Sequence, residues 1–88
     1  MDIEIYTSSF CGYCLLAKKI LINRDIPFVE TNLDMDPNKR TEMNRRSGGQ
    51  TSVPQIFFSG SHIGGHKELS ILEKNGALDL FLNQKNSV

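Results

Sequence analysis

The stretch IEIYTSSFCGYCLLAKKILINR, residues 3–24, decides the fold. Its start, from Ile3 to Thr7, has the β-branched and aromatic content of a short strand. After a loop, the apolar spacing becomes that of an amphipathic helix, with Leu16 and Ile20 four residues apart. A proline-containing break ends this helix near Arg24, and residues 28–31 again have strand composition. A strand, a helix and a second strand form a βαβ unit, which implies a parallel pair joined by a right-handed crossover.

The rest of the chain adds two helices, two strands and a short helical segment. The predicted elements are a helix over 37–46, a strand over 55–58, a turn over 59–61, a strand beginning at 62–63, a helix through Leu69, Ile71 and Leu72 that ends at Asn75-Gly76, and a last helical segment over 77–82. Asp36 as N-cap and Pro37 at the first position predict where the first of these helices begins. The short link between the last two strands predicts an antiparallel hairpin. The order β-α-β-α-β-β-α with a C-terminal helix is typical of an α/β protein.

The length and net charge of the chain limit the number of domains and the kinds of partner that are expected. The chain has 88 residues, with 10 Lys and Arg against 10 Asp and Glu and a formal net charge of 0. This length predicts a single domain over residues 1–88. Without a basic excess, neither nucleic acid nor an anionic membrane is expected as the main partner. No apolar run approaches the roughly 18 residues of a membrane span, and the acidic, alternating start of the chain is unlike a signal peptide.

The only two cysteines, Cys11 and Cys14, lie where the first loop becomes a helix. They are too close in sequence to staple distant elements together. A helix N-terminus favours a thiolate through its unpaired N–H groups and partial positive charge, and such a site lowers the pKa of a cysteine. Cys11 is therefore predicted to be the exposed nucleophile and Cys14, one turn on, the deeper resolving sulfur. C-x-x-C beside a βαβ unit predicts redox chemistry.

The alternative for these cysteines is a metal site, because His62 and His66 form an H-x3-H pair. A Cys2His2 zinc finger has about 12–15 residues between its two pairs. Here residues 15–61, 47 in all, intervene and encode two strands and a helix. No metal site is therefore predicted, and His62 is interpreted as a surface residue of an edge strand.

Two further motifs leave alternatives open. Pro54 in Ser52-Val53-Pro54 is compatible with an ordinary strand start, whereas a cis bond before it would turn the Val53 backbone toward a ligand. Gly64-Gly65 before a helix is either a turn or the entry to an anion site at the N–H groups of residues 66–68. The basic residues Lys39, Arg40, Arg45 and Arg46 form a solvated helix face, from which one side chain can pair with a ligand carboxylate.

With these motifs in place, the chain resembles a glutaredoxin of the thioredoxin superfamily, and the small bacterial dithiol members most closely. The resemblance is carried by Ile5-Tyr6-Thr7 leading to Cys11-Gly12-Tyr13-Cys14, by Ser52-Val53-Pro54-Gln55-Ile56-Phe57, by Ile63-Gly64-Gly65, and by the helix opening at Glu68-Leu69. It extends from Ile3 to about Leu82. It implies a thioredoxin-like fold, a four-stranded mixed sheet flanked by helices, in agreement with the predicted order of elements.

The same resemblance implies site residues. They are the catalytic pair Cys11 and Cys14, and a glutathione groove made by Tyr13, Arg40, Ser52, Val53, Pro54, Gly65, His66, Lys67 and Glu68. Within this groove Pro54 is the cis-proline of the family, and Val53 pairs with glutathione through its backbone. Residues 65–68 receive the γ-glutamyl carboxylate, with Glu68 standing where the family usually has Asp. Arg40 matches a helix position that reaches the glycyl carboxylate.

Three positions depart from the family pattern. Gly12 replaces the usual Pro between the cysteines, and a more permissive residue is expected to loosen the loop and shift the thiol pKa and the redox potential. Ser8 stands where many members carry a Lys that assists the thiolate. Lys67 lies in a stretch that often holds Ser, Thr or Asp, and it adds positive potential at the anion site.

The predicted function is that of a glutathione-dependent thiol–disulfide oxidoreductase acting on protein–glutathione mixed disulfides and protein disulfides. Glutathione is expected as a co-substrate, with no bound cofactor, and the protein as a cytoplasmic monomer. Two alternatives stay open. One is a dimeric carrier of a [2Fe–2S] cluster, which the Gly12 motif permits, and the other is a thioredoxin-like electron donor to one specific reductase. A pure binding module would leave an oxidation-sensitive thiol pair unexplained.

Overall fold

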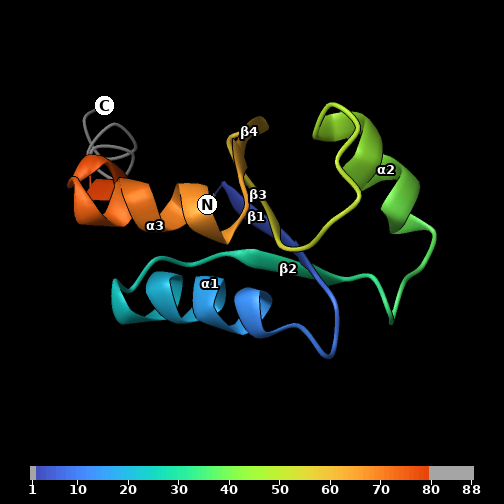
Figure 1. Cartoon of the computed structure of the whole chain (residues 1–88), viewed down its shortest axis with the longest axis horizontal. Coiled ribbons are helices and arrows are strands. Elements are labelled where there is room, and N and C mark those ends of the chain that lie inside the picture. The colour runs from blue at the N-terminus through green and yellow to red at the C-terminus, as the bar shows by residue number, and fades with distance from the viewer. Residues whose placement is uncertain (1, 80–88) are drawn as a thin grey trace.

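The computed structural model describes residues 2–79. Figure 1 shows β1 (Ile3–Thr7), α1 (Gly12–Asn23), β2 (Val29–Asn32), α2 (Lys39–Arg46), β3 (Gln55–Phe58), β4 (Ser61–Gly64) and α3 (His66–Lys74). This order confirms the predicted sequence of elements. Residues 77–79 form a further helical turn, in agreement with the last predicted segment, and residues 80–82 of that segment lie outside the described part of the chain.

The four strands form one mixed sheet in the order β2-β1-β3-β4. β1 is parallel to β2, with Ile5 opposite Glu30, and antiparallel to β3, with Ile5 opposite Ile56. A turn at Ser59 and Gly60, with φ angles of 48° and 84°, joins β3 to the antiparallel β4. Two successive positive φ angles are what a two-residue type I′ hairpin requires. The predicted parallel and antiparallel pairs are therefore confirmed.

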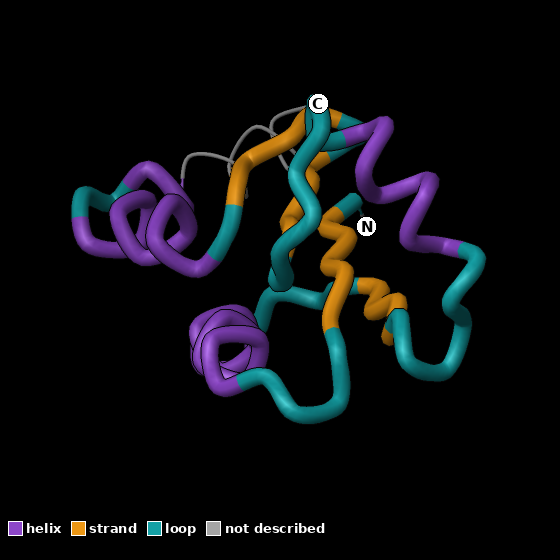
Figure 2. The backbone as a smooth tube through the Cα atoms, turned by 45° about the vertical axis from the view of Figure 1, so that its right-hand side comes forward, coloured by secondary structure: helices purple, strands orange, loops and turns teal. Residues whose placement is uncertain are grey.

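Helices cover both faces of the sheet (Figure 2). One face packs against α1 and α3, and its core consists of Ile3, Ile5, Ala17, Leu21, Ile26, Ile56, Leu69 and Leu78. The other face packs against α2, through Tyr6, Leu33, Met43 and Phe57. Successive β1 side chains alternate between these two cores, so this inner strand is covered on both sides. Met43 is the buried contact of α2, as the sequence predicts.

The strand directions bring three segments to one end of the sheet. β1 and β4 both run antiparallel to β3, so their carboxyl ends lie at the same edge as the start of β3. The loop before α1, the residues before Gln55 and the start of α3 therefore converge. Cys11, Pro54 and Gly65 are far apart in the sequence and meet for this reason.

The start of α2 differs from the prediction. The helix begins at Lys39, with Asn38 before it, and not at Pro37 with Asp36 as N-cap. The carbonyls of Asp36 and Pro37 instead accept hydrogen bonds from the N–H groups of Lys39 and Arg40, three residues on. These i→i+3 bonds form a tight turn in place of a first α-helical turn.

Within residues 2–79, no helix is both long enough and apolar enough to cross a membrane.

Candidate active site

Cys11 occupies the N-cap position of α1. Its φ and ψ angles of −132° and 106° are extended, and its carbonyl accepts the first helical hydrogen bond, from the Leu15 N–H at 3.1 Å. The preceding loop is held by the Ser9 N–H, which donates to the Asp34 carboxylate at 2.7 Å. The Cys11 Sγ accepts a hydrogen bond from the Cys14 N–H at 3.1 Å. The sulfur therefore replaces the oxygen of an ordinary capping side chain, where donors and the helix dipole stabilise negative charge.

The two cysteine sulfurs are bonded to each other, with their Cα atoms 5.2 Å apart across the first turn of α1. Cys11 is half-buried, while Cys14 is only 1% exposed and lies under the helix. The predicted difference in depth is confirmed. A reagent approaching from solvent meets the Cys11 sulfur first.

The segment before β3 lies against the Cys11 sulfur. The Val53–Pro54 peptide bond is cis, as the family resemblance implied. The Val53 carbonyl oxygen lies 3.7 Å from the Cys11 Sγ. Among residues 2–79, the Val53 N–H has no hydrogen-bond partner. The residue whose carbonyl lies beside the Cys11 sulfur thus also carries a backbone donor with no partner among residues 2–79.

A groove of about 360 Å³ opens beside this segment. It is lined by Tyr13, Ser52, Val53, Pro54, Gly65, His66, Lys67 and Glu68. The structure thus brings together every predicted groove residue except Arg40. The Arg40 guanidinium donates instead to the Thr51 carbonyl at 3.0 Å, one residue before the groove begins. Within the groove the Tyr13 and His66 rings lie 5.4 Å apart.

A carboxylate of the chain itself already lies at the start of α3. The Glu68 Oε1 accepts a hydrogen bond from the Gly65 N–H at 2.7 Å, and this bond lowers the pKa of the Glu68 carboxyl. Gly64 has a φ of 134°, and a Cβ there would lie 2.6 Å from the Glu68 Cγ. This contact was not predicted from the sequence, although the three-residue spacing from Gly65 to Glu68 is that of a capping box.

A second hollow, of about 410 Å³, lies on the other side of the cysteines. Its lining includes Phe10, Cys11, Cys14, Leu15 and Lys18. The Phe10 side chain is fully exposed. Leu15, which lines the same hollow, is also exposed, so the two side chains together offer an apolar surface beside the cysteines. Phe10 was not predicted as a site residue, and the signal for it in the sequence is an aromatic side chain directly before the first cysteine of the motif.

The two histidines have different surroundings. His62 bonds to Gln55, with 2.6 Å between the His62 Nε2 and the Gln55 Oε1, while His66 lies against Tyr13 in the groove. The described residues bring together no group of three or more His, Cys, Asp or Glu that would hold a metal ion. His62 lies on the exposed edge strand β4, as predicted.

Comparison with known proteins points to one family. The glutaredoxin family model matches residues 3–63. Glutaredoxin 3 of Escherichia coli is 44% identical over 81 residues, which cover 92% of this chain and 96% of that protein. The solution structure of glutaredoxin from Brucella melitensis matches with a TM-score of 0.78 and 40% identity over 93% of this chain and 88% of the other.

A more distant structure supports the fold. The crystal structure of a buckwheat glutaredoxin–glutathione complex matches with a TM-score of 0.86 and 23% identity, over 99% of this chain and 81% of the other. The four-stranded mixed sheet with flanking helices is thus thioredoxin-like. This chain belongs to the glutaredoxin family and is a thiol–disulfide oxidoreductase whose redox-active pair is Cys11 and Cys14.

Proposed function

We propose that the protein uses glutathione as a co-substrate to reduce protein–glutathione mixed disulfides and protein disulfides. The observation that supports this proposal is the groove beside Cys11, which is lined both by Val53, whose N–H has no partner among residues 2–79, and by the start of α3. Both cysteines and the groove come from one chain, which supports action as a monomer. A glutathione pool is kept reduced in the cytoplasm, which we propose as the compartment.

Recognition of glutathione combines backbone pairing with charge. The Val53 N–H and C=O are proposed to pair with the cysteinyl part of glutathione as a neighbouring strand would. The N–H groups at the start of α3 and the Lys67 ammonium favour the γ-glutamyl carboxylate. Glu68 is proposed to meet the adjacent amino group, and Arg40 the glycyl carboxylate. The similarity of fold to a glutaredoxin bound to glutathione supports this arrangement.

The first reaction uses Cys11 alone. Its thiolate attacks the glutathione sulfur of a mixed disulfide, a bond forms between Cys11 and glutathione, and the substrate protein leaves as a thiolate. A second glutathione thiolate then attacks the glutathione sulfur held on Cys11. This step gives oxidised glutathione and returns Cys11 as a thiolate, stabilised by the Cys14 N–H at 3.1 Å.

The second reaction uses both cysteines. Cys11 attacks a protein disulfide to form a mixed disulfide with the protein, and the Cys14 thiolate then attacks the Cys11 sulfur. The Cys11–Cys14 bond forms, and the protein leaves fully reduced. Two glutathione molecules then reduce the Cys11–Cys14 bond by thiol–disulfide exchange and leave as oxidised glutathione. The exposed Phe10 beside Cys11 supports a polypeptide substrate, because it offers an apolar surface to residues that flank the reacting disulfide.

Serine variants of the two cysteines test the proposal. Cys11→Ser is expected to abolish all turnover, while Cys14→Ser keeps glutathione mixed-disulfide reduction and loses protein-disulfide reduction. The assay follows the formation of oxidised glutathione from a glutathionylated peptide, with a disulfide-bonded protein as the second substrate. Loss of peptide turnover in Cys14→Ser together with its retention in Cys11→Ser would reverse the assigned roles. The proposed function would be disproved if the wild-type protein formed no oxidised glutathione in this assay.

A further inference from the structure

The Gln55 side chain lies behind the groove and is almost entirely buried. Gln55 directly follows Pro54, opens β3 and is only 4% exposed. A buried amide must find hydrogen-bond partners. Its Nε2 donates to the Ser52 carbonyl oxygen at 3.1 Å and lies 3.3 Å from the Ser52 Oγ. The amide thus ties the start of the strand back to the residue before Val53.

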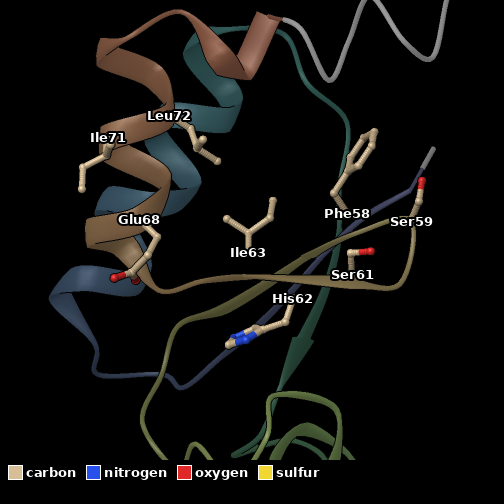
Figure 3. A pocket seen from close by; sticks show the side chains of 8 residues that line it. All are labelled: Phe58, Ser59, Ser61, His62, Ile63, Glu68, Ile71 and Leu72. Atoms are coloured by element: carbon tan, nitrogen blue, oxygen red, sulfur yellow. The ribbon is translucent and has the colours of Figure 1, made fainter.

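The other end of the same amide is held by His62. Because the Gln55 Nε2 donates to Ser52, the Oε1 is the atom that faces the His62 Nε2 at 2.6 Å. The oxygen can only accept, so the His62 Nε2 carries the hydrogen. His62 lines the hollow between β4 and α3 together with Ile63, Ile71 and Leu72, and its ring lies on the other side of β4 from the Ile63 side chain (Figure 3). Its ring lies 5.1 Å from that of Phe57, which fixes its position on this face.

We propose that Gln55 is a positioning residue that aims the Val53 N–H into the glutathione groove, with His62 as its support. The Ser52 carbonyl and the Val53 N–H belong to one planar peptide group, in which they point in opposite directions. A hydrogen bond that holds the carbonyl toward Gln55 therefore holds the N–H on the other side. Val53 and Ser52 line the groove, and the Val53 N–H has no partner among residues 2–79.

The hydrogen bond that Gln55 donates to the Ser52 carbonyl also acts on the Val53 N–H, which belongs to the same peptide group. Hydrogen bonds in a chain polarise one another, so the series from His62 through Gln55 to Ser52 makes the Val53 N–H a better donor. This inference rests on the proposed function, because it assigns a role in binding glutathione. Gln55 touches neither sulfur, so its effect is expected on the affinity for glutathione and not on the reactivity of Cys11.

The substitution Gln55→Glu tests the role of the amide with little change in shape. The carboxylate still accepts from His62, but it places an oxygen where a donor faced the Ser52 carbonyl. We expect the KM for glutathione to rise about threefold to tenfold, which is the effect expected from the loss of one hydrogen bond, with little change in kcat. The rate at which reduced Cys11 reacts with iodoacetamide should stay at the wild-type value.

Two further variants control for the added charge and test the same series of hydrogen bonds at a second residue. Gln50→Glu makes the same chemical change at an exposed glutamine, whose side chain makes none of the described contacts to Ser52, and controls for the added charge. His62→Phe keeps a ring beside Phe57 but removes the Nε2–H, and it should raise the KM for glutathione by a smaller factor. His62 is exposed, so this variant is expected to fold even if Gln55→Glu does not.

The outcomes separate this inference from the proposed function. If wild type does not turn over the glutathionylated peptide, the proposed function fails and this inference fails with it. If wild type is active but Gln55→Glu has the same KM for glutathione as Gln50→Glu, and His62→Phe has the same KM as wild type, the positioning role alone is wrong. A slower reaction of Cys11 with iodoacetamide in Gln55→Glu would also contradict it, because the side chain would then act on the nucleophile.

Discussion

Gly12 stands at the first position of α1, where the N–H group has no partner within the helix. The family pattern has Pro here, and the surroundings of Gly12 are compatible with it. The preceding residue, Cys11, has φ −132° and ψ 106°, the extended conformation that a following proline favours. A Cβ added at Gly12 meets no atom within 4 Å. Gly12 is therefore not required by sterics, and it leaves the unfolded chain more conformational freedom than proline would.

Gly12→Pro should stabilise the reduced protein by about 0.4–1 kcal/mol, because proline restricts the unfolded chain and suits the first position of a helix. Urea unfolding with both cysteines reduced measures this change. Gly12→Ala serves as the control and should give a smaller gain, since it restricts the unfolded chain less. A loss of stability in Gly12→Pro would mean that the Gly12 N–H or the local backbone is needed as it stands.

At the scale of elements, α3 has one fully buried side chain, Leu69, and Leu72 packs partly buried against the same core. Leu69 is fully buried in the core shared with α1 and the sheet, whereas Ile71, two residues on in the same helix, is 50% exposed. Figure 3 shows Ile71 and Leu72 on the part of α3 that borders the hollow beside β4. The position of the groove therefore depends on Leu69, because the start of the same helix lines the groove.

Leu69→Ala should destabilise the protein by about 2–5 kcal/mol through lost burial and a cavity. Ile71→Ala should cost well under half of that, because much of its side chain is already in water. The free energies of unfolding from urea titrations compare the two variants in one helix. Equal losses would contradict the packing described for α3.

At the scale of the whole molecule, α2 is attached to the sheet by a polar network as well as by Met43. The Arg46 guanidinium binds both Glu4 carboxylate oxygens, at 2.8 and 3.0 Å, and donates to the Tyr6 hydroxyl at 2.8 Å. The Tyr6 hydroxyl in turn donates to Glu42 at 2.6 Å. The hydrogen bonds from Arg46 hold the pKa of Glu4 below its ordinary value of 4.5. The hydrogen bond from Tyr6 likewise lowers the pKa of Glu42.

A carboxyl whose pKa is lower in the folded state stabilises that state above its unfolded pKa and loses this effect as the pH falls through the folded pKa. Wild type should therefore be more stable to unfolding than Glu4→Gln. This difference in free energy should have its largest value above pH 5 and shrink as the pH falls below 4.5. Urea unfolding of both proteins from pH 7 to pH 3 measures it. A difference that stays constant over this range would show that the charge of Glu4 does not attach α2.

Local sequence signals predicted most elements and the chemistry of the cysteine pair. The helix after Cys11 and the strand from Gln55 were placed to within a residue, because period, proline breaks and turn residues act over a few neighbours. The predicted start of α2 was wrong because Asp36 and Pro37 also suit a tight turn. The i→i+3 hydrogen bonds from the N–H groups of Lys39 and Arg40 stabilise that turn.

The groove residues Val53, Pro54 and Gly65 came from the family resemblance and not from local pattern, which left their roles open. What the sequence by itself determined is therefore the order of elements and a thiol pair at a helix start. Only the tertiary structure decided that Val53 lies 3.7 Å from the Cys11 sulfur and that Gln55 joins His62 to Ser52. The physical reason is that strand order and direction bring distant segments together, and no local propensity encodes which partners a buried polar group will find.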